Sequence, residues 1–201
     1  PDDFRIVSLD TGTKRPGLEK STYKIRRDEC DHMKALLNEK FGYASLAEVS
    51  TPEKFTTATA HIQAVAPASV GRLKYLYEAQ ARFADTLEAW RSGDIEKVGQ
   101  NFRADGIGLR DDYVISGPEL ETMCEIARSV PGVLGERMLG GGDKGASGAL
   151  IWAGAFDDLK STVESTYPLC HPAFSNEFAI HSCRTVDGIT SAPLLAHPGK
   201  Q

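Results

Sequence analysis

The stretch MLGGGDKGASGALI, from Met138 to Ile151, carries a glycine-rich loop between two apolar runs. The runs VLGERML before the loop and GALIWAG after it are β-prone, and they predict two strands joined by the loop. Glycine lets backbone N–H groups approach a phosphate closely, but unrelated folds use such loops, and some loops of this kind are only turns. We therefore expect a strand–loop–strand element whose function the surrounding residues must decide.

The spacing of the glycines excludes the common nucleotide-binding loops. Gly140, Gly142 and Gly145 satisfy G-x-G-x-x-G, but a dinucleotide-binding fingerprint needs a helix directly after the loop, and an apolar β-prone run follows instead. A Walker A loop needs Lys and then Ser or Thr after G-x-x-x-x-G, and here Ala146 follows. The later motifs of protein kinases, V-A-I-K, H-R-D and D-F-G, are absent. From spacing alone, a glycine-rich hairpin that only forms a tight turn stays open.

Further strands and helices alternate on both sides of this element. Hydrophobic periodicity predicts strands at 4–9 and 177–183, helices at 21–42, 73–91, 116–130 and 155–167, and a helix start at 50–55. Ser116 and Glu119 form an S-x-x-E pattern that predicts a capping box. In helix 73–91 four aromatic side chains at helical spacing are expected in the core: Tyr75, Tyr77, Phe83 and Trp90. The order predicts an α+β fold with helices packed on an antiparallel sheet.

Composition and charge narrow the class of protein. The net charge of -5, with 23 Lys and Arg spread along the chain, argues against a nucleic-acid binder. No apolar run approaches the roughly 20 residues that span a bilayer, and no basic-then-apolar leader opens the chain. The four cysteines are too sparse for a disulfide scaffold, so we expect reduced thiols and a cytoplasmic protein. The chain enters a strand almost directly after Pro1, which we expect of the middle of a longer protein.

A metal site is not expected. Cys170, His171, His181 and Cys183 could supply four zinc ligands. Adjacent ligands such as Cys170 and His171 suit a tetrahedral site poorly, because structural zinc sites space their ligands by two to four residues. We therefore assign no metal ligand.

The residues around the loop resemble a known family. The stretch LRDDYVISGPELETMCEIARSVPGVLGERMLGGGDKGASGALI, residues 109–151, resembles the C-terminal half of galactokinases, members of the GHMP small-molecule kinase superfamily. The family pattern has Ser-Leu-Arg-Asp-Asp-Tyr, a helix that begins Pro-Glu-Leu-Asp, and Gly-Ala-Arg-Met-Thr-Gly-x-Gly-Phe-Gly-Gly-Cys before a strand. STYKIRRDEC at 21–30, EAWRSGDIEKVG at 88–99 and HPAFSNEFAIHSC at 171–183 are also similar to galactokinase and galacturonokinase-type sequences. The resemblance covers nearly the whole chain in the right order.

The resemblance implies an organisation and a function. Residues 1–60 would be the tail of an N-terminal lobe with its connecting helix, and residues 61–201 a GHMP-kinase C-terminal domain. The chain would be the C-terminal part of an ATP- and Mg²⁺-dependent sugar 1-kinase, acting on galactose or a related sugar such as galacturonate. The family's phosphate loop and catalytic aspartate lie in its N-terminal half and are not found here. We therefore assign no catalytic residue, expect this chain to be inactive alone, and expect the N-terminal half of the same kinase as its partner.

The resemblance also implies the site residues. Tyr23 matches the family tyrosine that lines the sugar pocket. The family's third motif, a glycine loop beside the nucleotide phosphates, corresponds to Gly140, Gly141, Gly142, Asp143, Lys144 and Gly145. Asp10 and Asp111 are tempting as bases, but neither matches the family's catalytic aspartate.

This chain departs from the family at two places. The family's Phe-Gly-Gly-Cys is replaced at the loop tip, and our hypothesis is that Lys144 supplies positive charge toward a phosphate while Asp143 orients it; the alternative is a solvated surface pair. The family's His and Glu in the preceding helix correspond to Tyr75 and Ala79. These departures keep a second function open, a non-catalytic relative that senses sugar or binds a partner.

Overall fold

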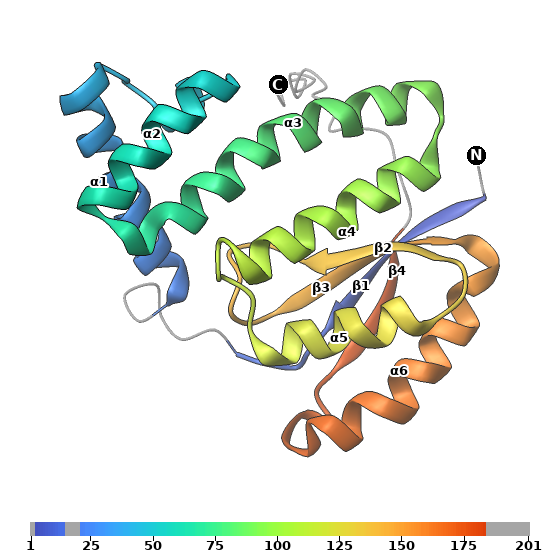
Figure 1. Cartoon of the computed structure of the whole chain (residues 1–201). Helices are drawn as coiled ribbons and strands as arrows, with labels where there is room; N and C mark the ends of the chain where they lie inside the picture. The colour runs from blue at the N-terminus through green and yellow to red at the C-terminus, as the bar shows by residue number, and fades with distance from the viewer. Residues whose placement is uncertain (1–2, 15–20, 184–201) are drawn as a thin grey trace, which may run out of the picture.

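The computed structural model describes residues 3–14 and 21–183. Helices and strands follow one another along the chain as in Figure 1, with short 3-10 turns between some of them. They are β1 (Phe4–Asp10), α1 (Thr22–Phe41), α2 (Pro52–Val65), α3 (Val70–Ser92), α4 (Ile95–Asp111), α5 (Pro118–Ser129), β2 (Val133–Met138), β3 (Ala146–Trp152), α6 (Phe156–Cys170) and β4 (Ala179–Cys183). The predicted strands are confirmed, and so are the helices predicted at 21–42, 73–91, 116–130 and 155–167 and the helix start at 50–55.

The four strands form one antiparallel sheet in the order β2-β3-β1-β4. β1, the first strand of the chain, lies between β3 and β4, with Val7 opposite Ala149 on one side and Ser182 on the other. Successive side chains of a strand point to opposite faces, so alternate residues of β1 belong to different layers. The predicted α+β class, with helices on an antiparallel sheet, is confirmed.

Helices α5 and α6 cover one face of the sheet (Figure 1). Val7 and Leu9 of β1 are fully buried there. They pack with residues of both helices and of β3: Met123, Ile126, Ala127, Ala149, Ile151, Leu159, Val163 and Tyr167. Burying this apolar set supplies the main driving force for closing the sheet against the two helices.

Helix α4 lies against β2 at unusually short range. Gly106 faces the strand so closely that an added Cβ would lie 2.8 Å from the Glu136 carbonyl oxygen. Glu136 itself is 1% exposed, and its carboxylate binds Arg103 of α4 and Arg128 of α5. A buried charge requires such partners, so this strand residue joins two helices.

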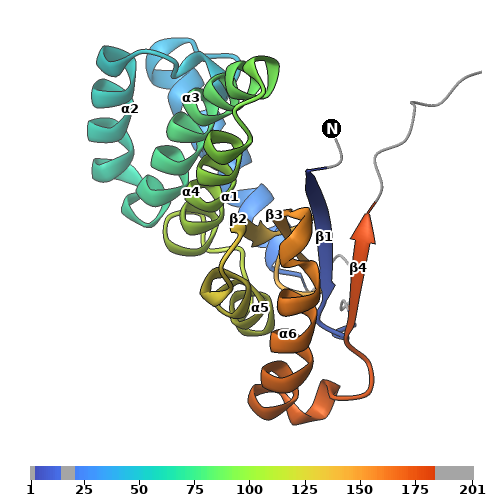
Figure 2. The ribbon, with the colours of Figure 1, turned by 90° about the vertical axis from the view of Figure 1, so that its right-hand side faces the viewer.

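Helices α1, α2 and α3 form a second packed group beyond α4, seen at the left of Figure 2. Its buried residues include Met33 and Leu37 of α1 and Leu73 of α3. Gly42 ends α1 in the left-handed conformation, at the position predicted for the terminator. The group holds α1 in place, which matters because the first turn of α1 carries Tyr23.

Two predictions about the helices are wrong. Phe83 and Trp90 are 66% and 48% exposed, so the apolar stripe of α3 is only partly core. Tyr75 is buried as expected. The capping box is also wrong, because α5 begins after Gly117 and the Ser116 hydroxyl donates to Glu121 instead. Pro118 at the start of α5 needs no N–H partner, so the helix begins without that cap.

Candidate functional site: the glycine loop

The loop at residues 139–145 joins β2 to β3 and contains several left-handed residues. Gly140, Gly142 and Gly145 have φ values of 75°, 78° and 105°. Asp143 has φ 67°, which an aspartate adopts more readily than most residues. These backbone angles let the chain double back within the loop.

The turn that follows β1 holds one end of the loop. The backbone N–H and the Oγ1 of Thr11 both donate to the Gly145 carbonyl, at 2.9 and 2.5 Å. The Gly145 N–H in turn donates to Thr13 Oγ1 at 2.9 Å. Beneath this contact the buried hydroxyl of Tyr167 donates to the Thr11 carbonyl at 2.8 Å. Burial raises the pKa of Tyr167 to about 12, so the phenol stays a donor at neutral pH.

The segment before α5 holds the loop at Gly142 and Asp143. The Asp143 N–H donates to the Ile115 carbonyl at 2.7 Å. A Cβ added at Gly117 would overlap the Asp143 carbonyl oxygen, and one added at Gly142 would overlap the Ile115 carbonyl oxygen. Glycine is required at both positions because backbone meets backbone there.

Tyr23 lies against the middle of the loop. Its ring carbon Cδ2 is 3.4 Å from the position that a Cβ on Gly141 would occupy. Tyr23 is 42% exposed, so one side of its ring packs on the loop and the rest faces solvent. The structure therefore brings together two residues that the sequence analysis singled out far apart in the chain.

Three amides of the loop have no partner among the residues that the structure describes. The N–H groups of Gly140, Gly141 and Gly142 make no hydrogen bond to any residue within the described ranges. Gly141, the middle one, is also the residue beside Tyr23. Consecutive free backbone N–H groups in a left-handed loop form a concave arrangement that suits an anion.

Lys144 is paired with a carboxylate of helix α5. Its Nζ donates to both oxygens of Glu119 at 3.0 Å. The two side chains are only 27% and 12% exposed, so this is not a solvated surface pair. Burial opposes ionisation of Glu119, but a backbone N–H and the Lys144 ammonium outweigh it and lower the pKa of this carboxyl. Asp143 is fixed through its backbone, so the expectation that it orients Lys144 is corrected: Glu119 does so.

Comparison with known sequences gives a consistent result. No family model matches the chain. A galactokinase of Clostridium perfringens strain SM101 is 33% identical over 165 residues, which are 82% of this chain and 42% of that protein. A galactokinase of Limosilactobacillus reuteri strain DSM 20016 is 28% identical over 186 residues, which are 92% of this chain and 46% of that protein.

Solved structures agree with the sequences. The crystal structure of Lactococcus lactis galactokinase complexed with galactose has a TM-score of 0.79 and 26% identity, covering 90% of this chain and 45% of that one. The chain is the counterpart of the C-terminal half of the galactokinases. An L. major mevalonate kinase in complex with R-mevalonate, at 18% identity and a TM-score of 0.58, shares the fold alone. The galactokinase-like chain thus spans less than half the length of the relatives it matches.

The remaining candidate residues of this galactokinase-like chain have ordinary partners. Asp10 accepts a hydrogen bond from the Gly12 N–H at 2.9 Å, and Asp111 pairs with Arg110 at 2.7 Å. His171 contacts the Thr122 hydroxyl through Nε2. Within residues 3–14 and 21–183, no three His, Cys, Asp or Glu side chains gather where they could hold a metal ion. None of the helices described there combines the length and apolar character that crossing a bilayer requires.

Sequence reasoning missed the residues that hold the galactokinase-like loop. Thr11 and Thr13 lie just after the strand predicted at 4–9, where the sequence indicates no more than the end of that strand. Glu119 was assigned to a capping box rather than to Lys144. A buried threonine in a turn and a lysine within a glycine loop are signals that such partners exist, but neither signal says which distant residue supplies them.

Proposed function

We propose that this chain is the C-terminal part of a cytoplasmic, ATP-dependent sugar 1-kinase that phosphorylates galactose or a related sugar. The galactokinases that it matches and the galactose complex of the Lactococcus lactis enzyme support the sugar class. The contact of the Tyr23 ring with Gly141 is the observation that carries the proposal. A kinase must hold a sugar hydroxyl against a phosphate, and here the proposed sugar residue lies directly beside the proposed phosphate loop.

In this proposal the loop stabilises the negative charge of the phosphate. The free N–H groups of Gly140, Gly141 and Gly142 would face the phosphate oxygens, where fixed dipoles stabilise developing charge without reorganising. Lys144 would add positive charge nearby, while Glu119 limits its movement. ATP with Mg²⁺, when bound, supplies the phosphoryl group and neutralises part of its charge. No Mg²⁺ ligand is assigned to the described residues, so its binding is left to the rest of the protein.

Tyr23 would position the sugar. It lies in the first turn of α1, and the packing of α1 on α2 and α3 keeps its ring against the loop. The phosphate loop, the catalytic aspartate and most sugar contacts would come from the N-terminal half of the same kinase. In this proposal, residues 1–60 belong with that N-terminal half and residues 61–201 form the GHMP-kinase C-terminal domain. We expect no phosphate transfer from residues 1–201 alone.

The test is an assay of the complete gene product that contains this chain. ADP release is coupled to a spectroscopic readout and measured against a panel of aldoses and uronates, galactose and galacturonate included. Saturable release with one of them supports the proposal. Tight sugar binding with no ADP release from any sugar would instead indicate a non-catalytic sensor and would contradict it.

A further inference from the structure

A cavity of 290 Å³ lies between α3, α4 and the end of β2. Its lining includes Ala79, Arg82 and Phe83 of α3, Phe102 and Asp105 of α4, and Arg137 of β2. Two guanidinium groups therefore face it, together with one carboxylate and two aromatic rings. Its volume is at the lower end of the range for small-molecule sites, about 300 Å³ and above.

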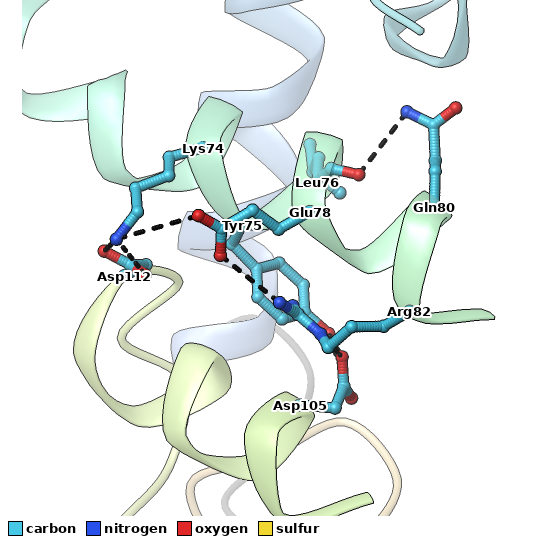
Figure 3. A network of polar contacts seen from close by, with 8 residues as sticks. All are labelled: Lys74, Tyr75, Leu76, Glu78, Gln80, Arg82, Asp105 and Asp112. Carbon is cyan, nitrogen blue, oxygen red and sulfur yellow. Dashed lines mark hydrogen bonds and ion pairs between the residues drawn. The ribbon is translucent and has the colours of Figure 1, made fainter. Parts of the chain in front are cut away.

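The single carboxylate is shared among three donors, of which Figure 3 shows Tyr75 and Arg82. Asp105 accepts from Arg82 Nε at 3.3 Å and from the Tyr75 hydroxyl at 3.2 Å, and it forms a close ion pair with Arg137 Nη1. Glu78 reaches Arg82 Nη1 from outside the cavity lining. Arg137 therefore has only a shared carboxylate to balance its charge.

Arg137 also keeps an unused donor. Its Nε donates to the Met138 carbonyl at 3.1 Å and its Nη1 to Asp105, whereas its Nη2 makes no hydrogen bond to any residue that the structure describes. The guanidinium lies 5.5 Å from the centre of the Phe102 ring. A guanidinium with free N–H groups beside an aromatic wall favours a planar anion, above all a carboxylate.

Residue 79 leaves part of the space open. It is an alanine, which contributes only a methyl group to the lining. A glutamate at 79 would bring a carboxylate into the lining that Ala79 now leaves small. The exposed ring of Phe83 and the partly buried ring of Phe102 both line this space and offer it apolar surface.

We propose that this cavity binds a small carboxylate with a flat apolar body. The carboxylate accepts from Arg137 Nη2, in the space that residue 79 leaves unfilled, and the apolar body packs between Phe83 and Phe102. The pairing is favourable because it satisfies a free donor and balances a guanidinium charge in partly buried surroundings.

Benzoate is the probe, with neutral benzamide of the same shape as its control. Each is titrated into the complete gene product and followed by calorimetry or by NMR shifts. Benzoate should bind saturably and benzamide about tenfold more weakly, because a neutral amide forms a weaker hydrogen bond with a guanidinium than a carboxylate does. The idea fails if benzoate does not saturate at millimolar concentrations or if both compounds bind alike.

Variants at residue 79 locate the binding. Ala79→Glu should supply the carboxylate within the chain and reduce benzoate affinity about tenfold or more, while Ala79→Leu should do so by filling the space. The matched controls are Ala81→Glu and Ala81→Leu, at an exposed position of the same helix. Phe83→Ser, at the exposed rim, is a further variant that should fold normally and bind benzoate more weakly. Unchanged affinity in the folded residue-79 variants would overturn the proposal.

Discussion

Lys144 reaches from the glycine loop to Glu119 in the first turn of α5, with its ammonium 3.0 Å from both carboxylate oxygens. The pair fastens the tip of the loop to a helix that is itself packed on the sheet. A charge placed at the loop tip is thus held by a residue 25 positions earlier in the chain.

Breaking the Lys144 pair should cost stability in a pH-dependent way. Glu119→Gln removes a carboxylate whose pKa is lowered in the folded protein. A lowered folded pKa means that the stabilisation is complete above the unfolded pKa, near 4.5, and is lost as the pH falls through the folded pKa. We expect a loss of about 1–2 kcal/mol at neutral pH that largely disappears near pH 3.

Urea unfolding at the two pH values measures this difference. Glu164→Gln is the control, because Glu164 belongs to an exposed pair with Lys160 that should contribute little at either pH. An equal cost of Glu119→Gln at both pH values would show that the ion pair is not the cause.

Adding one methyl group to the loop should destabilise the fold. Gly142 has φ 78°, and a Cβ there would overlap the Ile115 carbonyl oxygen, so Gly142→Ala should cost about 2 kcal/mol or more. Gly154→Ala is the matched control, since nothing lies within 4 Å of its added Cβ. The midpoint of thermal unfolding should fall for the first variant and stay close to the wild type for the second; a Gly142→Ala protein as stable as the wild type would contradict the close backbone contact.

Replacing Tyr23 should affect the sugar more than the nucleotide. Under the proposed function, Tyr23→Ala removes the ring beside Gly141 and should raise the KM for sugar about tenfold or more, with a smaller change in the KM for ATP. Ile25→Ala, at an exposed site in the same part of α1, is the control and should change neither constant. Steady-state assays of the complete gene product give both values, and an unchanged KM for sugar in Tyr23→Ala would remove the tyrosine from the sugar site.

Replacing the buried carboxylate of Glu136 should strongly lower the free energy of unfolding. Glu136→Ala leaves Arg103 and Arg128 without their shared partner and should cost about 3 kcal/mol or more. Glu88→Ala, at an exposed position of α3, should stay within about 0.5 kcal/mol of the wild type. Chemical denaturation of the two variants decides the matter: equal stabilities would mean that Arg103 and Arg128 are adequately hydrated without Glu136.

Periodicity predicted the strands and the helices α1, α3, α5 and α6, but it did not identify α4. This helix contains Gly99, Gly106 and Gly108, and each glycine lowers helix propensity by roughly 1 kcal/mol relative to alanine. The same glycines are what the fold requires, because Gly99 and Gly106 bring α4 against the backbone of β2. Local propensity and tertiary packing therefore conflict in this segment, and packing decides the outcome.

The exposed face of α3 shows a second limit. The spacing of Phe83 and Trp90 correctly marks an apolar stripe, yet both side chains are largely exposed. Periodicity tells which residues share a face of a helix, and it does not tell what covers that face.

At the site, the loop and Tyr23 were found through the family resemblance, whereas the residues that hold the loop were not. Thr13 and Gly145 are 132 positions apart, and no local pattern links them. The contact exists because β1 and β3 are neighbours in the sheet, so the turn after one meets the start of the other. Only the strand order, which the sequence did not reveal, brings them together.

The position of β1 in the sheet constrains when the chain can fold during translation. Among the four described strands β1 is synthesised first, but both strands that flank it come from the last third of the described chain. Its N–H and C=O groups therefore lack their partners in β3 and β4 while the helices from α1 to α5 emerge, and an unpaired strand edge invites pairing with another chain. We expect the sheet to close only after translation has passed Cys183, so premature termination before β4 should yield aggregates rather than a smaller folded domain.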